Sequence, residues 1–427
     1  MMEEHKRIPK LRFAEFSGEW ERKYLEDIGE VVNGLTYSPS DIDDNGILVL
    51  RSSNIQSSRL IFDDNVYVKV TDFNSVREND ILICVRNGSR RLIGKNALIT
   101  REAEGLAFGA FMTVFRSELN LFNFQLFATK RYFKTIHQNL GATINSINNN
   151  ELRKFDFYYP SRLEQQKIAS FLATVDKKIS RLQQKKALLK DYKKGVMQQI
   201  FPSAGSGQAS KLRFTREDGT TYPDWEEKKF KEIYSFYSTN SFSRDKLNYE
   251  TGEVRNVHYG DIHTKFSTLF DINDELVPYI NKEVDLSKIK KDSYLKLGDL
   301  LIADASEDYN DIGKTIEVVN LNDEKVISGL HTFHARPNKH KMALGFSGYL
   351  LQSWMIRKQV MKIAQGTKVL GISTGRLREI KFFIPSYEEQ TQIADFLSAI
   401  DKKIAVVQTQ IEHTQQFKKG LLQQLFV

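Results

Sequence analysis

Residues 159–201 read YPSRLEQQKIASFLATVDKKISRLQQKKALLKDYKKGVMQQIF, and residues 384–426 read IPSYEEQTQIADFLSAIDKKIAVVQTQIEHTQQFKKGLLQQLF, so one long stretch occurs twice in this chain. The two copies align without a gap, and their P-S, E-Q, I-A-x-F-L, D-K-K-I, K-K-G and Q-Q elements are identical. Self-similarity of this extent indicates a structural unit that the chain uses twice.

A second correspondence opens each half of the chain. LRFAEFSGEWERKYLEDI begins at Leu11 and LRFTREDGTTYPDWEEKKFKEI begins at Leu212, which pairs Trp20 with Trp225. Further along, ENDILICVRNGSRRLIGK lies over LGDLLIADASEDYNDIGK, and GAFMTVFR lies over GLHTFHAR. Because the ends and the framework repeat while the loops differ, the pattern indicates one scaffold that carries two different binding surfaces.

Apolar residues recur at alternating spacings of four and three through both copies, which predicts long helices that pair as a coiled coil. About 40 residues at 1.5 Å each make a rod of roughly 60 Å. Because a domain lies between the helices, an antiparallel pairing would give the molecule approximate twofold symmetry. Two alternatives stay open: each helix packs on its own domain, or two chains dimerise through the helices. The predicted seam, with its polar interruptions, consists of Ile168, Leu172, Val175, Ile179, Leu182, Lys186, Leu189, Lys193, Val196, Ile200, Ile393, Leu397, Ile400, Ile404, Val407, Ile411, Thr414, Lys418, Leu421 and Leu425.

The repeat predicts two mixed α+β domains separated by the two long helices. Short β-rich runs such as GILVLRSSNI and DLLIADAS precede helical stretches in both domains. The segment PSAGSGQASK is rich in Gly, Ser and Ala, which is typical of a flexible connector. We expect a first domain over 1–158, a first helix over 159–201, a linker over 202–211, a second domain over 212–383 and a second helix over 384–427.

The composition is that of a globular protein with a modest basic excess. Hydrophobic residues make up 41% and charged residues 27%, and 62 Lys and Arg stand against 54 Asp and Glu, a formal charge of +8. That excess suits a polyanion partner, although many proteins that bind no nucleic acid share it. The single cysteine, Cys84, excludes an intramolecular disulfide and a Cys-rich zinc site. The first residues, MMEEHKRIPK, lack an apolar signal region, so we expect a cytoplasmic protein without membrane contact.

Motifs of catalysis are not evident in the sequence. All eight prolines are isolated, which excludes the Asn/Asp-Pro-Pro-aromatic loop with which an adenine amino-methyltransferase holds its target amine. The Gly-x-Gly at 205–207 lies in the linker, and Asp308 stands where a P-loop would need its first glycine. His331 and His334 would point to opposite faces of a strand, so we interpret them as packing or surface residues. We therefore expect a binding protein with no catalytic residue, no metal site and no cofactor of its own.

These features together resemble the specificity (S) subunit of type I restriction-modification systems. The resemblance covers essentially the whole chain and rests on the P-x-LRF…GEW opening from Pro9 to Trp20, the D-I-L-I and I-G-K framework, and the paired helices. It implies that each domain is a target-recognition domain that reads one half of a bipartite, asymmetric sequence in double-stranded DNA. It also implies that the helices set the gap and dock two methylation subunits, which methylate adenine. Restriction subunits would complete the complex, and S-adenosylmethionine, ATP and Mg would bind to the partner subunits.

Candidates for DNA contact are loop side chains that differ between the halves at matched places, together with two lysines that are identical in both halves. Arg and Asn favour bidentate contacts to guanine and adenine respectively. Lys95 and Lys314, the identical pair, suit a phosphate contact or a structural role. Part of the set is expected to be ordinary solvated loop. The full set is Arg51, Asn54, Arg86, Asn87, Arg90, Arg91, Lys95, His258, Tyr259, His263, Lys265, Asp304, Ser306, Asn310 and Lys314.

Two other functions compete with a recognition subunit. The chain would be a self-sufficient DNA-modifying or DNA-cutting enzyme if it acted without partner subunits. It would be a coiled-coil scaffold if it did not bind DNA. Activity of the isolated chain distinguishes the first alternative, and salt-sensitive binding to duplex DNA counts against the second.

Overall fold

The computed structural model describes residues 7–140, 145–201, 210–338 and 342–427, so most of the predicted linker at 202–211 lies outside the described residues. The chain divides into two compact units. Unit 1 consists of Met1–Gln184 and Gln408–Val427, and unit 2 of Lys185–Val407. This division cuts both long helices, so it does not test the predicted domain limits, which follow the linear repeat and stay a prediction. None of the helices in the described ranges has the length and apolar character that a membrane crossing requires.

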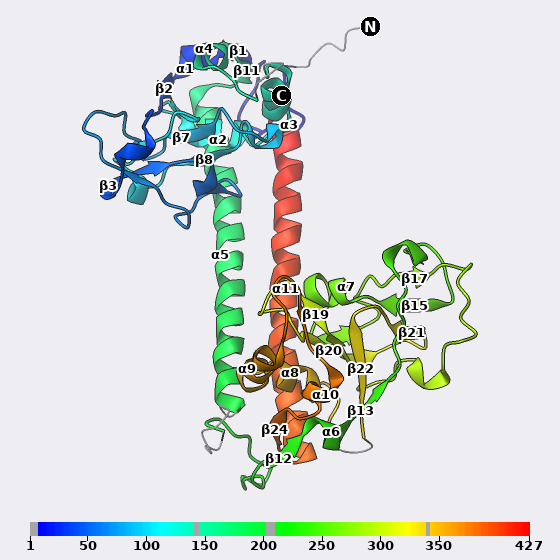
Figure 1. Ribbon diagram of the computed structural model, residues 1–427. Coiled ribbons are helices and arrows are strands. Elements are labelled where there is room, and N and C mark those ends of the chain that lie inside the picture. The colour runs from blue at the N-terminus through cyan, green and yellow to red at the C-terminus, as the bar shows by residue number, and fades with distance from the viewer. Residues whose placement is uncertain (1–6, 141–144, 202–209, 339–341) are drawn as a thin grey trace. The chain divides into compact units, whose positions relative to one another are not determined.

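Two long helices begin and end at equivalent residues of the repeat. Helix α5 spans Arg162–Ile200 and helix α11 spans Tyr387–Leu425, each with 39 residues (Figure 1). Before each helix a serine, Ser161 or Ser386, accepts a hydrogen bond from the backbone N–H three residues later at 3.4 Å. A serine hydroxyl at this place satisfies one of the free N–H groups of the first turn, which fixes where each helix begins.

The two helices run antiparallel. Leu421 and Leu425, near the end of α11, lie in the core of unit 1 with residues from the first half of α5. Val196 and Ile200, near the end of α5, lie in the core of unit 2 with residues from the first half of α11. Opposite ends of the helices therefore meet in both units. This confirms the predicted antiparallel pairing and excludes the alternative in which each helix packs only on its own domain.

The seam of the paired helices is largely shielded from solvent. All the predicted seam residues are buried or half-buried. Two of its polar positions, Lys193 and Lys418, are neutralised by carboxylates. Lys193 Nζ donates to both side-chain oxygens of Asp401 at 2.7 Å and lies 4.8 Å from the ring centroid of Tyr349. Lys418 Nζ donates to Asp176 Oδ1 at 2.6 Å.

Unit 1 is built on two sheets (Figure 1). One has the strand order β2-β10-β7-β8 and the other β6-β3-β9, and two antiparallel pairs, β1-β11 and β4-β5, accompany them. The strands are β1 (Glu21–Tyr24), β2 (Glu30–Asn33), β3 (Ile42–Leu50), β4 (Ile55–Gln56), β5 (Arg59–Leu60), β6 (Tyr67–Val68), β7 (Ile81–Cys84), β8 (Asn96–Leu98), β9 (Ala107–Phe108), β10 (Met112–Arg116) and β11 (Asp156–Tyr159). The short helices are α1 (Leu25–Ile28), α2 (Asn120–Leu126), α3 (Lys130–Gln138) and α4 (Asn149–Arg153).

Unit 2 repeats this plan with additions (Figure 1). Its larger sheet has the order β13-β22-β18-β20-β16, the second sheet β14-β17-β15-β21, and β12-β24 and β19-β23 are antiparallel pairs. The strands are β12 (Glu226–Lys229), β13 (Tyr234–Tyr237), β14 (Leu247–Asn248), β15 (Val254–Val257), β16 (Leu269–Asp271), β17 (Tyr279–Ile280), β18 (Leu300–Ala303), β19 (Ala305–Ser306), β20 (Thr315–Asn320), β21 (Lys325–Ser328), β22 (Thr332–Pro337), β23 (Leu370–Gly371) and β24 (Lys381–Ile384). The short helices are α6 (Phe230–Ile233), α7 (Tyr259–Thr264), α8 (Phe346–Gln352), α9 (Trp354–Ile363) and α10 (Thr374–Leu377).

The central strands β7 and β18 divide two hydrophobic cores in each unit. Successive side chains of a strand point to opposite faces of its sheet. In β7, Ile81 and Ile83 enter the core that contains α5, whereas Leu82 and Cys84 enter a separate core beneath the second sheet. The residues of β18 alternate in the same way between two cores of unit 2. Burial on both faces explains the continuous apolar runs ILIC and LLIA, and the mixed α+β fold predicted from the sequence is confirmed.

Candidate nucleic-acid interface

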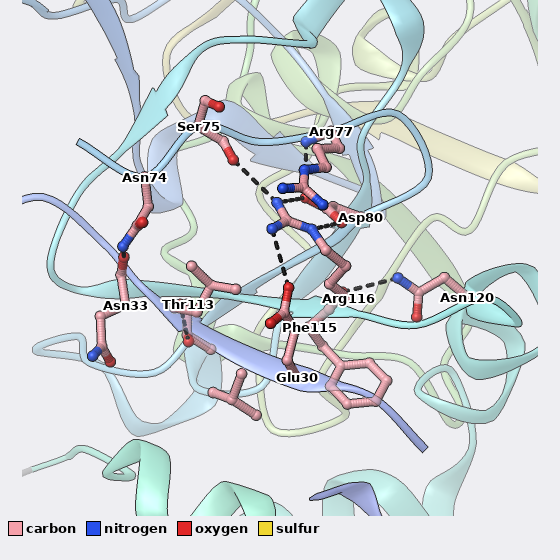
Figure 2. Close-up of polar contacts among 12 residues, drawn as sticks. Glu30, Asn33, Asn74, Ser75, Arg77, Asp80, Thr113, Phe115, Arg116 and Asn120 are labelled. Atoms are coloured by element: carbon pink, nitrogen blue, oxygen red, sulfur yellow. Dashed lines mark hydrogen bonds and ion pairs between the residues drawn. The ribbon is translucent and has the colours of Figure 1, made fainter. Parts of the chain in front are cut away.

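An ion pair fixes the start of strand β7 in unit 1. Arg116, the last residue of β10, donates from Nε to Asp80 Oδ1 at 2.9 Å and from Nη2 to Oδ2 at 2.7 Å (Figure 2). The backbone N–H of Arg77 also donates to Asp80 Oδ2, at 2.8 Å. The guanidinium of Arg116 further contacts the carbonyl oxygen of Ser75 at 3.1 Å and Glu30 Oε1 at 3.2 Å (Figure 2). Asp80 is therefore held from two sides immediately before β7.

Unit 2 contains the same ion pair at the matched positions. Arg336 donates from Nε and Nη2 to the two side-chain oxygens of Asp299, both at 2.7 Å, and the backbone N–H of Lys296 donates to Oδ2 at 2.7 Å. His334 Nε2 lies 2.7 Å from Oδ2 as well. Burial opposes ionisation of Asp299, but the hydrogen bonds from His334 and Arg336 outweigh it and hold the pKa of this carboxyl below its ordinary value. A buried aspartate that is held by an arginine and a backbone N–H thus immediately precedes both β7 and β18.

Lys95 contacts the segment after β3, and Lys314 contacts helix α7. Lys95 Nζ donates to the carbonyl oxygen of Ser52 at 2.9 Å, and Asn87 Nδ2 donates to the hydroxyl of the same serine at 3.1 Å. Lys314 Nζ donates to the carbonyl oxygen of His263. The predicted roles of these lysines are a phosphate contact or a structural role, and these hydrogen bonds are structural. A phosphate contact by either lysine stays a prediction.

The loop after β3 is stabilised by its own side chains. Asn54 is fully buried, and its Oδ1 accepts a hydrogen bond from the backbone N–H of Arg51 at 2.9 Å. Its Nδ2 donates to the carbonyl oxygen of Ile61 at 3.1 Å. The guanidinium of Arg51 donates to Asp64 Oδ2 at 2.9 Å and is partly exposed. Arg51 can therefore face a ligand in this conformation, whereas Asn54 could read a base only if the loop opened.

The turn after β7 presents arginines to solvent. Arg86 is exposed, and its guanidinium lies 5.5 Å from the ring centroid of Phe111, which is itself 56% exposed. Arg90 is exposed and donates from Nη2 to the carbonyl oxygen of His137 at 2.9 Å. Arg91 follows it and is also exposed. This turn, with Arg51 and Asn87 beside it, forms the basic candidate surface of unit 1.

His258 caps helix α7 rather than projecting from it. Its Nδ1 accepts a hydrogen bond from the backbone N–H of Gly260 at 3.2 Å, and its ring centroid lies 4.7 Å from that of Tyr259. Burial, together with the nearby positive charge of Arg244, lowers the pKa of His258 to about 4. The imidazole is therefore neutral at physiological pH, and the ring is almost fully buried. Tyr259, by contrast, is only half-buried.

The rest of helix α7 is tied to its surroundings. His263 Nε2 lies 3.0 Å from the carbonyl oxygen of Ala305, and the ring is half-buried. Lys265 is exposed, with Nζ 2.8 Å from Asp261 Oδ1. Lys265 can face a ligand, whereas His263 joins α7 to strand β19.

The segment after β18, which includes strand β19, contains the remaining candidates. Asp304 Oδ1 lies 3.2 Å from Nδ1 of His331, whose side chain is 50% exposed. Ser306 is buried, and its Oγ accepts from the backbone N–H of Asp308 at 3.0 Å. Asn310 is exposed. Among these residues, Asp304 and Asn310 have side-chain atoms that a ligand can reach.

Hydrogen bonds to Ser52 bring Asn87 and Lys95 together in unit 1, and His263 contacts both Lys314 and Ala305 in unit 2. The candidates Asn54, His258 and Ser306 are buried. Each unit also has one residue outside the predicted DNA-contact set beside an exposed or half-buried candidate. In unit 1 the addition is Phe111, which stacks with Arg86. In unit 2 it is His331, whose ring centroid lies 5.3 Å from that of Tyr259. The sequence could have indicated both residues, because Phe111 and His331 occupy matched positions of the repeat and differ in type. Within the described ranges, no three His, Cys, Asp or Glu side chains gather as a metal site would require.

Comparisons with known proteins identify the family of this chain. The family model described as the type I restriction modification DNA specificity domain matches it twice, at residues 17–191 and 222–415. The chain belongs to this family, which confirms the resemblance found in the sequence. The MjaVIII specificity subunit of a type I restriction enzyme of Methanocaldococcus jannaschii is 26% identical over 366 residues, covering 83% of this chain and 80% of that protein.

Solved structures agree on the fold. The S subunit of a type I restriction-modification system from M. genitalium matches with a TM-score of 0.57 at 14% identity, covering 98% of this chain and 99% of that chain. A chain from a study of complex assembly and conformational transition of the type I restriction-modification system matches with a TM-score of 0.51 at 14% identity, covering 94% and 96%. At these identities the likeness shows a shared fold along nearly the whole chain.

Proposed function

We propose that this chain is the DNA-reading subunit of a type I restriction-modification complex, with one recognition domain for each half of a bipartite, asymmetric site. The observation that carries the proposal is the repeated framework. The Asp80–Arg116 and Asp299–Arg336 ion pairs stand at matched places in the two units. The turns that follow β7 and β18 present different exposed side chains. Two copies of one scaffold that present different exposed side chains are suited to reading two different half-sites.

The long helices would set the gap between the half-sites and dock the methylation subunits. A helix of 39 residues is about 58 Å long at 1.5 Å per residue, which exceeds the roughly 34–36 Å of one turn of B-DNA. The lysines Lys193 and Lys418 sit at matched seam positions, and each is paired with a carboxylate, which suits a frame with approximate twofold symmetry. Such a frame offers two similar docking places, one for each of two methylation subunits.

The chemistry would lie in the partner subunits. We propose that the methylation subunits bind S-adenosylmethionine and methylate adenine, and that restriction subunits use ATP and Mg. This chain would contribute recognition alone. Its exposed arginines and its net charge of +8 support a share of phosphate contacts in the affinity. The alternative of a self-sufficient enzyme predicts that the purified chain, given S-adenosylmethionine, ATP and magnesium, modifies or cuts DNA by itself.

A domain exchange tests the proposal. Residues 212–383 are replaced by the matching domain of a specificity subunit with a different target, and the chimera is produced with its methylation subunits. Sequencing of N6-methyladenine then gives the methylated motif. We expect one half of the motif to change and the other to stay. A change in both halves, or in neither, contradicts the proposal.

A further inference from the structure

In each unit a pair of side chains lies where the segment after the central strand meets the turn before β10 or β22. In unit 1 the backbone N–H of Val85 donates to the carbonyl oxygen of Phe111 at 3.0 Å. In unit 2 the backbone N–H of Asp304 donates to the carbonyl oxygen of His331 at 3.1 Å. These bonds join the end of the central strand to the turn before β10 or β22. The turn residues Phe111 and His331 are therefore structural equivalents, and so are the segments 85–87 and 304–306.

In unit 1 this position offers hydrogen-bond donors. The Arg86 guanidinium lies 5.5 Å from the ring centroid of Phe111, and both side chains are exposed. Within the part of the chain that the structure describes, no residue accepts a hydrogen bond from this guanidinium. Arg51 and Arg90, in contrast, donate to Asp64 and to the backbone of His137. Stacking on an aromatic ring holds the planar donor fork of Arg86 without using its N–H groups.

In unit 2 the same position offers an acceptor. His331 has a positive φ of 54°, an unusual conformation for a residue with a β-carbon. Its ring is held between the edge contact with Tyr259 at 5.3 Å and the contact of Nδ1 with Asp304 Oδ1 at 3.2 Å. A carboxylate accepts only, so in the neutral imidazole it selects the tautomer with the proton on Nδ1. The other ring nitrogen, Nε2, then presents a lone pair from a side chain that is half exposed.

We propose that these two positions are specificity determinants of opposite polarity, an inference that rests on the proposed function. Arg86 donates two hydrogen bonds to O6 and N7 of a guanine in the half-site read by unit 1. His331 accepts a hydrogen bond from the exocyclic amino group of an adenine or a cytosine in the half-site read by unit 2. Both assignments follow the donor and acceptor pattern of base edges in the major groove. Arg86 lies in the segment after β7 and His331 in the turn before β22, and in each unit a backbone hydrogen bond joins these two kinds of segment.

Base preference, measured with the complete methylation complex, tests the proposal. The chain is produced with its methylation subunits and acts on duplexes whose half-site bases are randomised. The methylated products are sequenced. We expect Arg86→Ala to lower the preference for guanine at one position of one half-site by about tenfold. Arg86→Gln is expected to shift that preference towards adenine, because Gln pairs with N6 and N7 of adenine. His331→Ala is expected to relax one position of the other half-site only.

Exposed residues outside the turns serve as controls. Arg22→Ala in unit 1, at a side chain that is 57% exposed, and Lys282→Ala in unit 2 should leave both preferences unchanged. Thermal unfolding of every variant checks that it folds. A uniform loss of methylation across all sequences, without a change in base preference, would assign Arg86 to phosphate contact and overturn the inference. A wild-type complex that yields no bipartite motif would instead refute the proposed function.

Discussion

Lys418 Nζ donates to Asp176 Oδ1 at 2.6 Å, and Lys193 makes the equivalent contact with Asp401 at 2.7 Å. The two aspartates begin the D-K-K-I element, and the two lysines begin the K-K-G element of the repeat. Because the helices are antiparallel, the early element of one helix meets the late element of the other. The identity of both elements in the two copies thus has a structural explanation, since each copy must supply both halves of the pair.

Removing one lysine should weaken the paired helices. Lys418→Ala leaves Asp176 without its cation in a partly closed seam, with side-chain exposures of 17% and 35%. We expect the free energy of unfolding to fall by about 1 kcal/mol, since partial exposure screens the pair. Urea unfolding measures the change. Lys419→Ala, at the exposed neighbour, is the matched control. Equal effects of the two substitutions would show that the contact contributes nothing.

Breaking the buried Asp80–Arg116 ion pair of unit 1 should lower stability far more than breaking the Asp176–Lys418 pair. Arg116→Met leaves the Asp80 carboxylate, 3% exposed, without its bidentate partner. Breaking a buried pair by removing one member costs about 3–5 kcal/mol, whereas replacing both members by apolar residues is often close to neutral. We therefore expect a large loss of stability in Arg116→Met and recovery of much of it in Asp80→Leu/Arg116→Met. Calorimetric melting measures both, with the exposed Arg101→Met as the control. A double variant as unstable as the single one would argue against this explanation.

Acid should destabilise unit 2 through His258. Burial lowers the pKa of this imidazole in the folded protein to about 4, against an ordinary value of 6.5. Between these values the unfolded chain binds a proton that the folded chain does not, so stability is fully present above pH 6.5 and is lost as the pH falls towards 4. His258→Asn keeps an N-cap acceptor for Gly260 but does not titrate. We expect the melting temperature of this variant to fall less between pH 7.5 and 5. Parallel falls in the two proteins would contradict this explanation.

The frame of the molecule was predictable from the sequence, whereas the roles of individual loop residues were not. The burial of Ile168 and Leu425 was predictable because apolar residues recur with the heptad period of paired helices, which depends only on helix geometry. Asn54 and His258 are residue types that can read bases. In the structure, however, Asn54 stabilises its own loop and His258 caps α7. These roles depend on contacts between segments distant in the sequence. The role of His331 likewise depends on its contacts with Asp304 and Tyr259, which the sequence does not reveal.

The methylation pattern of a cell with and without this chain tests the central proposal most directly. N6-methyladenine is mapped across the genome in a strain that carries the methylation subunits and this chain, and in the same strain with the chain deleted. We expect one bipartite, asymmetric motif, with two specified parts separated by unspecified bases, that disappears on deletion. An unchanged pattern after deletion, or a single uninterrupted palindromic motif, would contradict a subunit with two different reading domains on one frame.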